Sequence, residues 1–254
     1  MLFRRKRVGP PSRPPPLQWE ATADPAGRFS TGIRDLDALL GGGYACGSAV
    51  AIEGEASVLP DDVLQIVLPT VFNFLKRGRG AIVVPPAGVP RSRIRDEALR
   101  CLSPELFEAR VRVVDYTTID TREPWVVPLA RYGRAEMIRA MVKAEEAARG
   151  ASGGHFLELT ALDTIENQLG PESASRMVTY GLGRAKEVGN LALAWFRSGA
   201  NGAQGVAGMT EVHLTLSRRP TGLSVRGIRP AFPARLIDWS AAGGCLRVGL
   251  GLPD

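Results

Sequence analysis

The residues of this 254-residue chain that are best placed to do chemistry lie in one short stretch around Gly54. Four carboxylic acids fall within it: Glu53, Glu55, Asp61 and Asp62. Carboxylate oxygens are ligands that Ca²⁺ and Mg²⁺ favour, but the spacing is not that of a known metal-binding loop. Residues 59–62 instead indicate the start of a helix, with a proline in the first turn and carboxylates at the end that attracts anions. We therefore predict no metal here.

Other reactive side chains are sparse. His155 and His213 are too few and too far apart for a metal cage, and no Ser-His-Asp or Cys-His arrangement follows from the spacing. Three scattered cysteines without CxxC spacing predict neither a disulfide framework nor a zinc site: Cys46, Cys101 and Cys245. Together with the lack of an apolar run long enough to span a bilayer or to form a signal peptide, this favours a soluble, cytoplasmic protein.

The acidic stretch lies within an alternation of apolar strands and helical patterns. Strands are predicted at residues 49–53, 81–84, 111–115, 156–162 and 191–196. Helices are predicted at residues 61–75, 93–102, 134–148 and 174–188, with a possible kink at Pro69. Strands that alternate with helices predict an α/β fold with a parallel sheet between helices.

The last third of the chain changes character. Short strands separated by turns are predicted at residues 212–217, 223–226, 235–237 and 246–248, and they should extend the sheet in antiparallel fashion. Between residues 198 and 208 a glycine-rich run has almost no bulk, so it predicts a mobile loop. We predict one domain, residues 28–254, whose β extension is residues 209–254.

The formal net charge of +6 is concentrated at the start of the chain. The first sixteen residues hold five prolines, no acid and five basic residues: Arg4, Arg5, Lys6, Arg7 and Arg13. We predict a flexible tail over residues 1–27, solvated rather than bound to nucleic acid, although a nucleic-acid contact through Arg4, Arg5, Lys6 and Arg7 stays open.

A family resemblance covers residues 29–254. The stretch Ser30-Thr-Gly-Ile-Arg-Asp-Leu-Asp-Ala-Leu-Leu-Gly-Gly-Gly-Tyr-Ala-Cys-Gly-Ser-Ala-Val-Ala-Ile-Glu-Gly54 resembles the first segment of KaiC-like and RadA-like members of the RecA superfamily of P-loop ATPases. Leu162-Asp163-Thr164 is similar to the end of a Walker B strand, and Val225-Arg226-Gly227 to a late strand of the family. The resemblance implies a RecA-like fold and a phosphate-binding loop that begins at Gly54.

That loop departs from the family pattern Gly-x-x-x-x-Gly-Lys-Ser/Thr, in which backbone N–H groups and the lysine hold phosphate and the hydroxyl holds magnesium. If Gly54 is the first glycine of the pattern and Glu55 the residue after it, Leu59, Pro60 and Asp61 fall at the positions of the second glycine, the lysine and the hydroxyl residue. Leucine lacks glycine's backbone freedom, proline has neither N–H nor charge, and aspartate repels a polyanion. We therefore predict a degenerate loop and expect no cofactor; ATP with Mg²⁺ belongs only to the alternative hypothesis below.

Two further family positions bear on catalysis. The glutamate that would activate water follows the second core strand, but Val83-Val-Pro-Pro-Ala-Gly88 has no carboxylate, and the next acid, Asp96, lies in a predicted helix. Asp163 is similar to the Walker B aspartate, with Glu158 as a competitor, and a structural capping role for Asp163 is favoured.

The resemblance also implies a role for the arginines of the late strand. The family counterpart of Arg226 reaches toward a neighbouring subunit's nucleotide, although Ser224 stands where a lysine is usual. Arg226 and Arg229 are either residues that act in trans or ordinary solvated arginines. In recombinases the loop at residues 198–208 touches DNA, but here only Arg197 flanks it, so a plain loop is favoured.

Three functions remain. The favoured hypothesis is a non-catalytic RecA-fold regulatory or scaffolding subunit that pairs with itself or with an intact KaiC/RecA-like ATPase. The alternatives are a divergent ATP-binding ATPase and a RadA-like accessory protein that binds DNA. Nucleotide binding and salt-dependent DNA binding separate them.

Overall fold

The apolar runs of the first two thirds form the parallel half of one large sheet. The computed structural model describes residues 18–130, 132–150, 154–242 and 245–252, and the basic cluster predicted at Arg4 to Arg7 lies outside these residues. The parallel strands are β4 (Ala49–Gly54), β5 (Gly80–Val84), β6 (Val111–Asp115), β7 (Val126–Pro128), β8 (Phe156–Ala161) and β9 (Leu191–Arg197). Their order in space is β4-β9-β8-β5-β6-β7. The predicted parallel sheet is confirmed.

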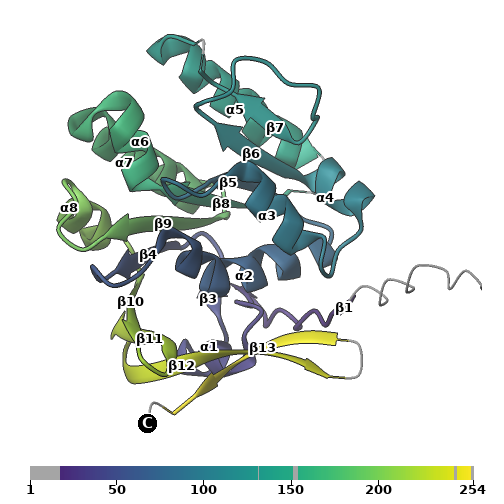
Figure 1. Cartoon of the computed structure of the whole chain (residues 1–254), viewed down its shortest axis with the longest axis vertical. Coiled ribbons are helices and arrows are strands. Elements are labelled where there is room, and N and C mark those ends of the chain that lie inside the picture. Colours follow the sequence, from purple (N-terminus) through teal and green to yellow (C-terminus); the bar gives the residue numbers. More distant parts are fainter. Residues whose placement is uncertain (1–17, 131, 151–153, 243–244, 253–254) are drawn as a thin grey trace, which may run out of the picture.

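The last third extends this sheet, as predicted. Strand β10 (Val212–Arg219) pairs parallel with β4, and β11 (Gly222–Arg229), β12 (Ala231–Ala242) and β13 (Cys245–Gly251) follow in antiparallel order. They form the yellow-green end of the molecule in Figure 1. Each strand is longer than the sequence indicated, because polar side chains of the solvent-facing side interrupt the apolar pattern.

Helices cover both faces of the sheet, and each face buries its own apolar cluster. One cluster packs under α1 (Arg34–Leu39), α2 (Leu64–Lys76), α3 (Arg91–Ala98) and α4 (Pro104–Arg110). The other packs under α5 (Arg134–Gly150), α6 (Leu162–Leu169), α7 (Pro171–Glu187) and α8 (Ala203–Gly208). Helix α2 continues through Pro69, and a 3-10 turn, η1 (Pro60–Val63), precedes it. This is the RecA-like α/β architecture.

The glycine-rich run at residues 198–208 is more ordered than predicted. Its second half forms α8, in which Val206 is completely buried and Ala203 nearly so. The expectation of a loop that cannot pack was wrong for residues 203–208, since one valine and one alanine suffice to hold a six-residue helix against the sheet.

Residues 18–27, which were placed in the predicted tail, are packed into the domain. Strand β1 (Gln18–Trp19) pairs with β13, and Trp19 is only 4% exposed. The Asp24 carboxylate accepts the N–H of Ser30 at 2.9 Å. Two further short strands, β2 (Arg28–Phe29) and β3 (Tyr44–Ala45), pair with each other. No helix of the described residues is long and apolar enough to cross a bilayer.

Candidate functional site

The loop after β4, residues 55–59, is held closed by hydrogen bonds that its backbone amides donate. The N–H of Glu55 donates to the Leu216 carbonyl (2.9 Å), and that of Val58 to the Glu55 carbonyl (2.9 Å). The N–H of Leu59 donates to the Asp62 carboxylate at 2.9 Å. In a phosphate-binding loop such amides point at the ligand, whereas here they are committed to acceptors of the protein itself.

The carboxylates of this loop are paired with arginines from distant elements. Asp62, whose side chain is 5% exposed, accepts a hydrogen bond from Arg218 of β10 at 2.5 Å. Asp61 lies 3.7 Å from the guanidinium of Arg93 in α3. In a working phosphate-binding loop, the lysine of the loop binds the phosphate of the nucleotide. Here the loop carries the carboxylates itself, and arginines of β10 and α3 bind them.

The side chains that the sequence grouped as a possible metal site diverge. The Glu53 carboxylate contacts His213 Nε2 (2.9 Å) and accepts a hydrogen bond from Ser198 Oγ (2.7 Å). Asp61 and Asp62 turn to their arginines. Within the described residues no cluster of histidine, cysteine and acidic side chains is arranged to hold a metal ion.

Gly54, the loop residue that matches the family, has a packing role. A Cβ atom at this position would lie 2.1 Å from Cη2 of Trp195, which is completely buried in β9. The glycine is therefore required for the close approach of the indole, independently of any phosphate.

The two acids that competed for the Walker B position lie in different places. Asp163 stands at the carboxyl end of β8, in the first turn of α6, and its carboxylate accepts the N–H of Thr164 at 2.9 Å. Burial raises the pKa of Asp163, although hydrogen bonds from Thr164 and Ala87 oppose this. Glu158 lies within β8 and faces α5 and α7. Asp163 is thus at the edge where a P-loop enzyme keeps its acid, and Glu158 is not.

A cavity of about 590 Å³ lies at the carboxyl ends of β5, β6 and β8. Its walls include residues 85–92 and Thr164, but none of residues 54–62. No carboxylate follows β5 directly, and Asp96 lies in α3 as expected. The carbonyl of Pro85 instead accepts a hydrogen bond from the Thr164 hydroxyl at 2.6 Å. A hydrogen bond between neutral groups thus closes the wall that follows β5, while the carboxylates that line the cavity come from elsewhere: Asp96, Asp115 and Glu123.

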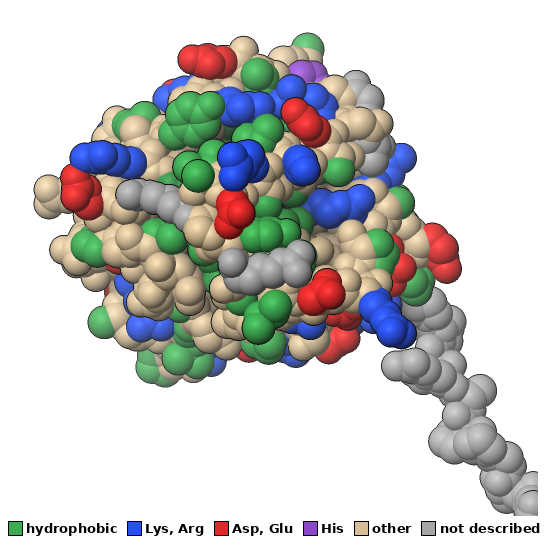
Figure 2. Space-filling view, turned by 90° about the horizontal axis from the view of Figure 1, so that it is seen from above, with side chains coloured by type: hydrophobic (Ala, Val, Ile, Leu, Met, Phe, Trp, Pro, Cys, Tyr) green, Lys and Arg blue, Asp and Glu red, His purple; other side chains and the backbone are tan. Residues whose placement is uncertain are grey.

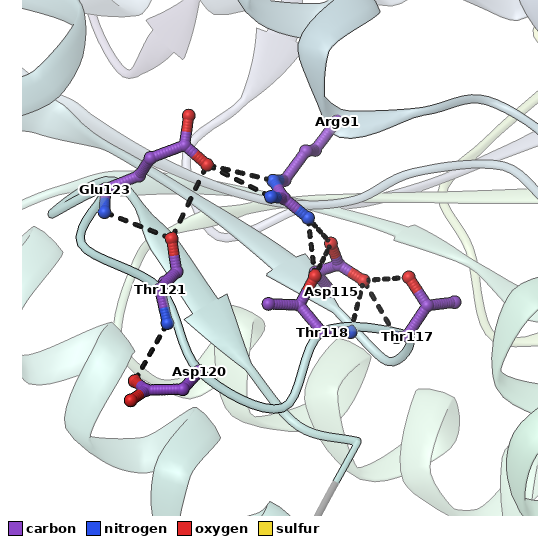
Figure 3. A network of polar contacts seen from close by, with 7 residues as sticks. All are labelled: Arg91, Asp115, Thr117, Thr118, Asp120, Thr121 and Glu123. Carbon is purple, nitrogen blue, oxygen red and sulfur yellow. Dashed lines mark hydrogen bonds and ion pairs between the residues drawn. The ribbon is translucent and has the colours of Figure 1, made fainter.

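An ion-pair network borders this cavity (Figure 3). The Arg91 guanidinium donates to Asp115 and, at 3.1 Å, to Glu123. Burial by itself would raise the pKa of Asp115, but hydrogen bonds from Thr117, Thr118 and Arg91 lower it to about 2. Arg91 is therefore neutralised by two carboxylates and is not available to an anionic ligand.

The other arginines of this region are paired in the same way. Arg93 contacts Glu97 at 3.0 Å, and Arg95 contacts Glu108 at 3.0 Å. Arg100 contacts Glu97 at 2.8 Å. On the face seen in Figure 2, basic and acidic side chains are intermingled rather than segregated. A nucleic-acid surface would need unpaired basic groups gathered on one face.

The arginines of the late strand differ from each other. Arg226 of β11 is exposed and makes no ion pair or side-chain hydrogen bond within the described part of the chain. Arg229 donates to the carbonyl of Thr210 at 2.6 Å and so braces the turn before β10. Ser224, two residues before Arg226, is paired with Ser217 of β10, and their hydroxyl groups are 2.8 Å apart.

Sequence reasoning missed Arg218 and Arg93. Neither is near the loop in sequence, and only the parallel pairing of β10 with β4 and the return of α3 over the sheet bring them there. The signal was indirect: two adjacent aspartates at a helix start need cations, and the sequence does not say which ones.

The chain is similar to known proteins over part of its length. A family model described as GvpD basic region 2 matches residues 18–124. Protein GvpD2 of Halobacterium salinarum is 36% identical over 112 residues, which are 44% of this chain and 23% of that protein. Protein GvpD1 of the same organism is 35% identical over 97 residues, 38% of this chain and 18% of that protein. The chain thus matches less than a quarter of the length of either relative.

The fold has a solved counterpart. The crystal structure of the KaiC-like protein PH0186 from Pyrococcus horikoshii superposes with a TM-score of 0.59 over 88% of this chain and 99% of that one, at 14% identity. The chain therefore has a KaiC-like, RecA-like α/β fold. In sequence it is similar to part of the GvpD proteins, over the region that contains the closed loop.

Proposed function

We propose that this chain is a non-catalytic RecA-fold subunit with a regulatory or scaffolding role, acting in an assembly with itself or with an intact KaiC/RecA-like ATPase. The observation that carries the proposal is the pairing of Asp62 with Arg218, together with the loop amides that donate to protein acceptors. ATP would have to break these contacts and then bring its phosphates beside two carboxylates.

The match to the family model described as GvpD basic region 2 covers the loop that carries the proposal. Residues 18–124 include the loop, α2 and β5, which are the parts that would carry catalysis in an ATPase of this fold. The regulatory role is our inference from a retained fold and a closed loop.

The direct test is the melting temperature of the purified chain with and without ATP and Mg²⁺. A ligand at one hundred times its Kd stabilises the protein by about 2.7 kcal/mol, which a thermal melt resolves easily. We expect no shift and no phosphate release. A saturable shift of that size would instead support the divergent ATPase.

A loop variant provides the matched control. Replacing Leu59→Gly, Pro60→Lys and Asp61→Thr in one chain restores the family pattern at these positions, while Asp62 and Arg218 stay as they are. If the closed loop is what excludes nucleotide, this variant should gain little binding until Asp62→Ala is added, because that change frees both the amide of residue 59 and the Arg218 guanidinium. A gain from the triple change alone would assign the exclusion to residue types rather than to the ion pair.

The DNA-binding alternative is tested in the same preparation. Binding of a single-stranded oligonucleotide should be undetectable at physiological salt, because the arginines of α3 are paired with carboxylates. Affinity that rises steeply as salt is lowered would favour the accessory-protein hypothesis.

A further inference from the structure

A second cavity, of about 330 Å³, lies on the opposite face of the sheet from α2. The residues that line it are far from the closed loop along the sequence. Helix α5 packs over β5, β6 and β7, whereas α7 packs over β9 and β4. The strand between them, β8, is left with an opening above it. The cavity fills that opening and is at the lower end of the volumes typical of small-molecule sites.

The walls of this cavity are apolar and adaptable. Met137 and Met141 of α5 face Met177 of α7, and Leu169 at the end of α6 closes one side. The spacing of four residues along α5 places both of its methionines on one stripe. Unbranched thioether side chains adjust to ligands of different shape.

The mouth of the cavity exposes large apolar side chains. Ile138 is 50% exposed and Tyr180 is 64% exposed, and both line the cavity. A tyrosine ring attracts an organic cation that lies over its face.

The floor of the cavity carries one acid. Glu158, in the middle of β8, accepts a hydrogen bond from the Thr160 hydroxyl at 3.0 Å and makes no ion pair within the described residues. A Cβ atom on Gly181 would lie 3.0 Å from its Oε1, so α7 passes close to the carboxylate only because this residue is a glycine. Burial, and then repulsion from Glu145, raises the pKa of Glu158 to about 7.

The cations around Glu158 are bonded to other acids, although the charge of Arg184 still lowers the pKa of Glu158 somewhat. Those that face it or line the same cavity are Glu145, Tyr116, Arg176, Tyr180 and Arg184. Arg184 is engaged by Glu145 at 3.3 Å, and Arg176 by Glu172 at 2.5 Å. An acid buried among apolar side chains is stabilised in its ionised form by a partner that brings its own positive charge.

We propose that this cavity binds a small organic cation with an apolar body, such as an alkylammonium ion, whose N–H groups donate to the Glu158 carboxylate while its hydrocarbon chain lies against the three methionines. The ammonium supplies the missing counter-charge, and the chain removes apolar surface from water at the cavity walls. The proposal is independent of the closed loop and of any nucleotide.

The test compares three ligands of equal length: hexylammonium, hexanol and hexanoate. Binding is followed by the NMR signals of the methionine methyl groups in the full chain. We expect saturable shifts of the Met137, Met141 and Met177 signals with hexylammonium, with a Kd of about 1 mM or tighter. Hexanol should bind at least tenfold more weakly and hexanoate not at all. Equal affinities for the three ligands, or no saturable shift with the amine, would overturn the proposal.

Two variants locate the charge. Glu158→Gln should weaken the amine about tenfold and leave hexanol unchanged, whereas Glu146→Gln, on the exposed side of α5, should change neither. In the native chain, affinity for the amine should fall as the pH drops from 8 to 6, because protons compete for the carboxylate. This dependence should vanish in Glu158→Gln, and its persistence there would contradict the assignment. The comparison of the three ligands stands on the native chain, so it decides the question even if a variant folds poorly.

Discussion

The indole of Trp195 lies directly against Gly54, so close that a single added carbon on the glycine would overlap it at 2.1 Å. In a P-loop enzyme the glycine at this position serves the phosphate. Here the packing of Trp195 accounts for the glycine at position 54, so the glycine is not evidence for nucleotide binding.

This contact predicts a stability effect. Gly54→Ala should lower the free energy of unfolding by about 1–3 kcal/mol, since overpacking a rigid core forces neighbours from their rotamers. Gly183→Ala is the matched control: its Cβ would meet nothing within 4 Å in α7, and alanine there should stabilise the helix by up to about 1 kcal/mol. Urea unfolding measures both. Equal stabilities for the native chain and Gly54→Ala would show that the indole can move away freely.

The pairing of Asp62 with Arg218 predicts a coupling energy. Arg218→Ala removes the cation from a carboxylate that is only 5% exposed, and this should cost about 1 kcal/mol, a figure reduced because the Arg218 side chain is itself 48% exposed. A double-mutant cycle with Asp62→Ala should give less than the sum of the single effects. Arg219→Ala, an exposed neighbour, should change stability by less than about 0.5 kcal/mol. Strict additivity in the cycle would mean that the pair does not close the loop.

The network of Figure 3 predicts a dependence on acid. The pKa of Asp115 falls from an ordinary value of 3.8 to about 2 in the fold, so its stabilising effect is complete above about pH 5 and is lost as the pH falls toward 2. Asp115→Asn should remove this part of the acid sensitivity. The measurement is the difference between the urea midpoints of the two proteins at pH 5 and at about pH 2.5. A difference that does not change with pH would contradict the assignment.

The sequence predicted the fold better than it predicted the site. The parallel strands follow from apolar runs such as residues 111–115, whose bounds the structure matches. That the loop does not bind phosphate stays a prediction; it follows from Leu59, Pro60 and Asp61, because the chemistry of each residue opposes phosphate on its own. Such local signals need no knowledge of the fold.

The contacts that close the loop could not be predicted in this way. Arg218 is separated from Asp62 by 156 positions, and their meeting depends on β10 pairing with β4. Val206 was missed for a related reason: in a glycine-rich run one buried side chain decides whether a helix forms, and its burial depends on the strands around it. The role of Gly54 likewise appears only when β9 is placed beside β4.

The last prediction concerns Arg226, which the family resemblance places on a strand that serves a neighbouring subunit. Its side chain is exposed and makes no ion pair within the described residues, so its charge is free to meet an acidic or phosphate group of another chain. If the proposed assembly uses this face, Arg226→Glu should shift the sedimentation coefficient toward that of the monomer while the melting temperature stays within a few degrees. Arg139→Glu, on the exposed side of α5, carries the same charge change on another part of the surface and should leave the assembly intact.

If the native chain sediments as a monomer at every concentration, self-assembly is ruled out, and the proposal then depends on an ATPase partner that co-purifies. In that case Arg226→Ala should lower the partner's ATPase rate in the reconstituted complex, and an unchanged rate there would remove the trans-acting role altogether.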